Sequence, residues 1–217
     1  MQVIRTNARR VQILVGMLLA LGVPLLPLGA WGERLSLFGP LVGHETLWWL
    51  AVAVLLFYVL RVERRPLTSI GLRRLGLRDI LIGVLAGILM FVGAKVINSE
   101  IFLRFHFQAN MHEAYRIAAA PFWYRFILVL RAAVVEEILF RGYAIERLQE
   151  LTGSILSAAV ISWLAFTVTH LNSWGLAFLI YAGFHGVILT LLYVWRRNLC
   201  SNIIAHGTVD CAIYLFR

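Results

Sequence analysis

Apolar runs recur along almost the whole chain, and each approaches the roughly 20 residues that an α-helix needs to cross a bilayer. Hydrophobic residues make up 61% of the 217 residues and charged residues only 14%, unlike a soluble domain. We therefore predict an all-α fold, a polytopic membrane bundle of about seven to eight transmembrane helices that encloses a polar cavity. The eighth helix would come from a bend or split of the sixth run at Gly183 or Gly186. The runs are residues 11–31, 47–61, 79–98, 121–141, 155–172, 174–195 and 199–216.

The arrangement of basic residues predicts how the chain is oriented in the membrane. The first connection holds one arginine, Arg34, beside Glu33 and Glu45. The second connection is rich in arginine: Arg61, Arg64, Arg65, Arg73, Arg74 and Arg78. The positive-inside rule then places the N-terminus and residues 61–78 in the cytoplasm. The first run is too long for the apolar part of a signal peptide and is expected to stay as an anchor. We predict an integral protein of a bacterial plasma membrane, as the compact size suggests.

The chain is predicted to form one integral-membrane domain, residues 1–217. It would consist of an N-terminal helical pair (1–65), an Arg-rich cytoplasmic loop (66–78) and a helical core (79–217), with the chemical motifs in 121–217. The net charge of +9 does not indicate nucleic-acid binding, because the arginines lie in short loops beside apolar spans. Lipid phosphates of the bilayer are the expected partners of these arginines.

Two adjacent carboxylates and an arginine interrupt one of the most apolar stretches: Glu136, Glu137 and Arg141. Ionisable groups at membrane depth lose hydration or must pair, so they indicate a structural or chemical use. Neighbouring positions on an α-helix diverge by about 100°, so the two carboxylates should face different partners. Glu137 and Arg141 are four apart in the favourable order for an intrahelical ion pair. This pairing would leave Glu136 free to face other helices.

A turn at Thr152-Gly153-Ser154 would fold the flanking runs into an antiparallel hairpin. Glu136 lies fifteen residues before Leu151, and His170 lies fifteen residues after Ile155. Both would then lie about 22 Å from the turn, at the same level. A carboxylate and an imidazole held together in a dry site can polarise a water molecule.

His206 and Asp210 are four apart on the last run and would share one face of a helix. Such a pair can stabilise a developing oxyanion or complete the hydrogen bonding of a water molecule. A structural reading is also open, because helix bundles use buried ion pairs and interhelical hydrogen bonds without any chemistry.

Other residues are assigned packing roles. Gly83 and Gly87 have the small-xxx-small spacing of an internal helix-packing surface. Arg131 is expected to belong to a second ion pair, and His44 to lie in an external connection without a partner at metal-ligand spacing.

In its three polar motifs the chain resembles the CPBP family of intramembrane glutamic proteases, which includes the CAAX prenyl proteases of the Rce1 type. The family pattern EExxxR matches Glu136 to Arg141, FxxxH matches Phe166 to His170, and HxxxN or HxxxD matches His206 to Asp210. The specific match covers roughly residues 125–217.

The resemblance implies a bundle of about eight helices around a cavity in which a Glu-activated water hydrolyses a peptide bond. Glu136 would be the general base with His170, while His206 and Asp210 would stabilise the oxyanion. Supporting roles would fall to Glu137, Arg141 and Phe166. The resemblance implies no metal or other cofactor, and its substrate would be a membrane protein or peptide. Prenyl proteases of this type typically carry Asn where this chain has Asp210.

Three other functions use similar residues. A non-catalytic membrane protein, such as a bacteriocin self-immunity or scaffold protein, would use them structurally. A zinc-dependent membrane protease could bind its metal through one Glu and two His, although the sequence contains no HExxH motif. A proton-coupled transporter also uses intramembrane Glu and His, but its usual paired, interrupted segments are missing from the two halves of the sequence.

Overall fold

The structure, a computed structural model, describes residues 2–35, 39–106 and 112–216. In these ranges the regular elements are all helical, which confirms the predicted all-α membrane bundle. In chain order they are α1 (Gln2–Met17), η1 (Leu18–Gly22), η2 (Val23–Leu25), α2 (Leu28–Leu35), α3 (Pro40–Phe57), η3 (Tyr58–Val62), η4 (Leu67–Ile70), α4 (Leu77–Ile97), η5 (Asn98–Leu103), α5 (His112–Ala119), α6 (Phe122–Arg131), η6 (Ala132–Ile145), α7 (Glu146–Thr152), α8 (Ile155–Thr169), α9 (Leu171–Trp174), α10 (Leu179–Arg196) and α11 (Leu199–Tyr214).

Five helical segments within the described ranges are long and apolar enough to cross a membrane, and the chain is an integral membrane protein. They fall on five of the seven predicted runs: Asn7–Leu25, Pro40–Val62, Leu77–Leu103, Ile155–Trp174 and Leu179–Arg196. The other two runs lie in the unbroken succession α6, η6 and α7, which carries the charged motif, and in α11, which has 16 residues.

Two predicted runs differ from the observed helices. The run 11–31 is broken after Leu25, because Leu26 is extended and precedes Pro27, which cannot donate a backbone hydrogen bond. A separate short helix, α2, follows and packs closely on α3. The bend or split considered at Gly183 or Gly186 does not occur, because α10 is continuous from Leu179 to Arg196. The chain is instead interrupted before α10, at Gly175, which has a φ of +77°.

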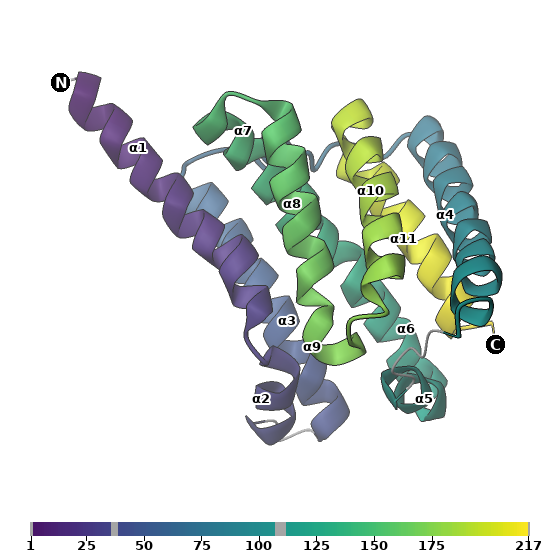
Figure 1. Ribbon diagram of the computed structural model, residues 1–217. Helices are drawn as coiled ribbons and strands as arrows, with labels where there is room; N and C mark the ends of the chain where they lie inside the picture. Colours follow the sequence, from purple (N-terminus) through teal and green to yellow (C-terminus); the bar gives the residue numbers. More distant parts are fainter. Residues whose placement is uncertain (1, 36–38, 107–111, 217) are drawn as a thin grey trace.

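The helices lie side by side and define two ends of the bundle (Figure 1). The first end, called the α7 end, comprises the start of α1, residues 61–78, the turn between α7 and α8, and the connection 196–198. The opposite end, called the α9 end, comprises α2, α5, α9 and the end of α11. The connections in which the sequence concentrates its arginines therefore all lie at the α7 end.

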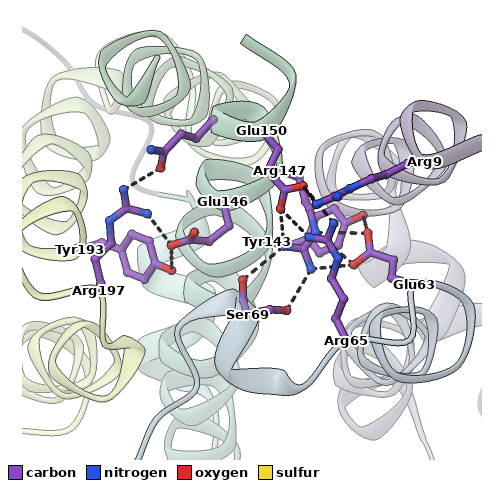
Figure 2. A network of polar contacts seen from close by, with 11 residues as sticks. Arg9, Glu63, Arg65, Ser69, Tyr143, Glu146, Arg147, Glu150, Tyr193 and Arg197 are labelled. Carbon is purple, nitrogen blue, oxygen red and sulfur yellow. Dashed lines mark hydrogen bonds and ion pairs between the residues drawn. The ribbon is translucent and has the colours of Figure 1, made fainter. Parts of the chain in front are cut away.

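A network of ion pairs cross-links the helices at the α7 end (Figure 2). Arg147 is only 1% exposed, and its guanidinium donates to the Glu63 carboxylate at a distance of 2.6 Å. The Tyr143 hydroxyl donates to the same carboxylate at 2.7 Å. On the other side of the network, the Tyr193 hydroxyl donates to the Glu146 carboxylate at 2.8 Å. These contacts join the end of η3, the helix 122–152 and α10. Further members are Arg9, Arg65, Ser69, Gln149, Glu150 and Arg197.

Helix α4 packs on α11 through its two predicted glycines. A Cβ at Gly83 would lie 2.7 Å from the Ser201 carbonyl oxygen, and one at Gly87 would lie 2.5 Å from the Thr208 Cβ. Both distances are too short for a side chain, so the glycines allow the close contact. The predicted internal packing role of this pair is confirmed, and it places α11 with its two polar residues against the core.

Candidate active site

The first two motifs are positioned by the predicted hairpin. Helix α7 ends at Thr152, Gly153 follows in the left-handed region at a φ of +70°, and α8 begins after Ser154. Glycine accepts this conformation at no steric cost, and the Ser154 side chain caps α8 by accepting from the Ser157 amide. The predicted turn is confirmed, and the helices that carry Glu136 and His170 run antiparallel.

A cavity of about 980 Å³ lies in the half of the bundle nearer the α9 end. The four residues that the motifs nominate for chemistry, Glu136, His170, His206 and Asp210, all line it. Positions separated by as many as 74 residues along the chain are thus brought together on one internal surface. His185 lines the same cavity and bonds through Nε2 to the Met90 carbonyl at 3.3 Å.

Glu137 lies at the centre of a fully buried polar cluster. Its carboxylate, 0% exposed, accepts from Arg141 at 2.9 Å, which confirms the predicted intrahelical ion pair. It also accepts from Nδ1 of His206 at 2.9 Å and from the side chain of Asn202 at 3.0 Å. Because an ionised carboxylate can only accept, Nδ1 of His206 must carry the proton. The other ring nitrogen, Nε2, lies 3.6 Å from Asp210, so the predicted shared face of these two residues is confirmed.

Phe166, the aromatic residue of the second motif, covers the buried guanidinium. The carbon at the centre of the Arg141 guanidinium lies 4.0 Å from the centre of the Phe166 ring, a cation–π contact in a desolvated setting. Arg141 also donates to the Gly186 carbonyl at 3.3 Å. A Cβ at Gly186 would lie 3.0 Å from the Phe166 ring, so the lack of a side chain at this position allows α10 to pack closely against α8. The aromatic residue thus shields the ion pair from the cavity.

Glu136 is not free, contrary to the sequence-based expectation. Its Oε1 accepts from Arg131 at 3.0 Å, and Arg131 also donates to Glu45 at 3.0 Å. The two residues are five apart, and they come together because η6 is π-helical, with hydrogen bonds between residues five apart. Glu45, expected in a connection, is instead 4% exposed within α3 and also accepts from the Tyr124 hydroxyl at 3.2 Å. The expectation that Arg131 joins an ion pair is confirmed.

His170 directly follows α8 as its C-cap residue, and one of its ring nitrogens is hydrogen-bonded to the backbone. Its Nδ1 bonds to the carbonyl oxygen of Phe166 at 2.9 Å, and a carbonyl has no proton to give. Nδ1 is therefore the donor, and Nε2 can accept when the ring is neutral. Within the described part of the chain, Glu136 and His170 share the cavity without a hydrogen bond between them.

Asn202 is a member of the buried cluster that the sequence reasoning missed. It is 0% exposed and donates to the Leu189 carbonyl at 2.7 Å as well as to Glu137. It precedes His206 by four residues, as His206 precedes Asp210, so the spacing Asn-xxx-His-xxx-Asp was the available signal. Through these two hydrogen bonds, Asn202 of α11 connects the Leu189 carbonyl of α10 to the Glu137 carboxylate.

The polar rim of the cavity lies at the α9 end. Glu33 of α2 accepts from His44 at 2.9 Å and from Arg116 of α5 at 3.1 Å, and all three line the cavity. Burial raises the pKa of Glu33, but these two hydrogen bonds outweigh it and hold that pKa below its ordinary value. The rim carboxylate is therefore ionised at neutral pH. His44, expected in an external connection, lies instead in the first turns of α3 and meets Glu33 because α2 packs against α3.

Both carboxylates of the first motif are neutralised by arginine, Glu136 by Arg131 and Glu137 by Arg141. No group of three or more His, Cys, Asp or Glu side chains that could hold a metal ion occurs within the residues that the structure describes.

Comparison with known proteins finds one family. Residues 118–212 match the model of the family described as "Type II CAAX prenyl endopeptidase Rce1-like". The matched segment contains all three motifs, and the predicted resemblance is confirmed. Neither the curated proteins nor the solved structures contain a match to the chain.

The buried cluster predicts a stability difference between the two adjacent carboxylates. Glu137→Gln leaves Arg141 buried without its counter-ion, which should lower the free energy of unfolding by about 3 kcal/mol or more. Glu136→Gln is the matched control, because Arg131 keeps its ion pair with Glu45. Thermal melting of the purified proteins in detergent measures both. Equal melting temperatures for the two variants would contradict the central position of Glu137.

Proposed function

We propose that the chain is an intramembrane endopeptidase that hydrolyses membrane-associated peptides with a water activated by Glu136, because residues 118–212 match the Rce1-like family of type II CAAX prenyl endopeptidases. One observation carries the proposal: four polar residues from three separate motifs line a single cavity within a membrane bundle. A purely structural use of these residues would require no such space beside them.

Glu136 is the general base. Its side chain is 15% exposed, the cavity reaches it, and Arg131 engages only Oε1. Oε2 takes a proton from a water whose second hydrogen is accepted by Nε2 of His170. The water oxygen then attacks the peptide carbonyl carbon, and the proton on Glu136 passes to the leaving amine as the C–N bond breaks. Arg131 fixes the direction of the carboxylate during both transfers.

His206 stabilises the oxyanion. Glu137 accepts from Nδ1, which orients the ring so that Nε2 is on the cavity side, close to Asp210. Protonated Nε2 donates to the oxygen of the tetrahedral intermediate, where preorganised donors lower the barrier most. Asp210 holds the imidazolium from the opposite side to Glu137. A neutral Asn at this position would instead donate directly to the same oxygen.

Substitution of the base tests the proposal directly. Glu136→Gln should abolish hydrolysis of a fluorescence-quenched apolar peptide, because an amide cannot accept the water proton, while melting remains close to that of wild type. Glu113→Gln is a control, because this carboxylate pairs with Arg116 at the rim. Hydrolysis by the Glu136→Gln enzyme at the wild-type rate would refute the assigned base.

Removal of metal separates the glutamic mechanism from a zinc-dependent one. Activity should survive dialysis against EDTA and phenanthroline, because a carboxylate and an imidazole polarise the water without a metal. The measurement is the hydrolysis rate before and after chelation, followed by addition of zinc. Loss of activity that zinc restores would establish the zinc protease instead.

The carboxylate at position 210 gives a graded prediction. Asp210→Asn should retain substantial activity, since the amide can donate to the oxyanion. Asp210→Ala should lose about 100-fold or more in kcat, the usual scale for one oxyanion-stabilising group. Comparable and near-complete loss in both variants would mean that the carboxylate itself is required, and wild-type rates in both would remove Asp210 from the site.

A further inference from the structure

The two ends of the bundle differ strongly in basic residues. The α9 end carries five whose side chains are described: Arg34, Lys95, Arg104, Arg116 and Arg125. The α7 end carries eleven: Arg9, Arg10, Arg61, Arg64, Arg65, Arg73, Arg74, Arg78, Arg147, Arg196 and Arg197. Lysine and arginine in short loops beside membrane spans mark the cytoplasmic side. The rule therefore orients the α7 end toward the cytoplasm.

The cavity is reached from the opposite end. Its lining includes α2, α9, the start of α10 and the end of α11, all of which lie toward the α9 end (Figure 1). Arg116 and Glu33 line it as well, and their side chains are 38% and 33% exposed. A rim of partly exposed charged groups indicates a water-accessible mouth.

The α7 end is closed to the cavity. None of the side chains drawn in Figure 2 lines it. Tyr193, which belongs to this network, is 0% exposed, as are Ile70 and Leu199, and all three form part of the main hydrophobic core. A peptide approaching from the arginine-rich side would meet ion pairs and packed side chains before reaching Glu136.

The wall of the cavity is aromatic and apolar between the rim and the polar residues. Trp48, Phe91, Trp174, Phe178 and Tyr181 line it. The rings of Trp174 and Phe178 stack with centroids 4.5 Å apart, and Phe178 lies 6.0 Å from the His170 ring. Such a wall favours extended apolar peptide over charged peptide.

We infer that the cavity opens on the extracytoplasmic side of the membrane and takes the outer end of an apolar segment from a membrane-anchored protein. The chemistry in this inference rests on the proposed endopeptidase function. The side of entry rests on the distribution of arginines and on the position of the cavity. A peptide that exists only in the cytoplasm is excluded as substrate.

The side of entry can be measured without any activity. In a background with Cys200→Ser and Cys211→Ala, single cysteines are placed at Thr68 in η4 and at Ser173 in α9, both exposed positions. Spheroplasts are treated with a membrane-impermeant maleimide before or after lysis. Ser173→Cys, which lines the cavity, should be labelled in intact spheroplasts, and Thr68→Cys only after lysis. The reverse pattern would overturn the inference.

The substrate class is tested separately, by comparing the membrane proteomes of cells that express the wild type and Glu136→Gln. New protein termini should appear with the wild type only and should map to the extracytoplasmic flank of apolar segments. Termini on cytoplasmic flanks would overturn the inference while leaving the proposed endopeptidase intact. A third outcome is that the cysteine labelling is as expected but the two proteomes show no difference in protein termini. In that case the proposed endopeptidase function and its substrate class are both refuted, and only the orientation in the membrane is supported.

Discussion

The buried carboxylate of Glu137 is the interaction on which the rest of the site depends. Removing a carboxylate and a guanidinium from water costs several kcal/mol for each ion, and their pairing and additional hydrogen bonds must offset this cost. The carboxylate of Glu137 accepts from three side chains, Arg141, His206 and Asn202. These bonds join the helix 122–152 to α11, and the contact of Arg141 with the Gly186 carbonyl adds α10. The same bonds that stabilise the ion pair thus fix the orientation of the His206 ring beside the cavity.

Two adjacent carboxylates acquire different properties because neighbouring positions of a helix point in different directions. Glu137 faces the core and is 0% exposed, whereas the Glu136 side chain is 15% exposed and faces the cavity. The wider turn aligns Glu136 with Arg131, which is anchored in turn by Glu45 of α3. One carboxylate is therefore suited to hold structure and the other to exchange protons, which is the division that the proposed mechanism uses.

Local spacing in the sequence was enough to predict a good part of this arrangement. The lengths of the apolar runs gave the helical membrane class, Gly153 marked the hairpin turn, and the four-residue spacing from Glu137 to Arg141 gave the ion pair. The pairing of Arg131 with Glu136 depends on a π-helical segment, which no rule based on α-helical periodicity detects. Glu45 lies 86 residues from Arg131, so no local spacing connects them. Tertiary packing supplied both contacts.

A double-mutant cycle on Glu137 and His206 tests the central interaction most directly. The free energy of unfolding would be measured in detergent for the wild type, Glu137→Gln, His206→Gln and the double variant. If the carboxylate and the imidazole act as one unit, the double variant should lose less stability than the two single losses combined, by about 1 kcal/mol or more. Losses that add within about 0.5 kcal/mol would contradict the coupling, because independent sites behave in that way.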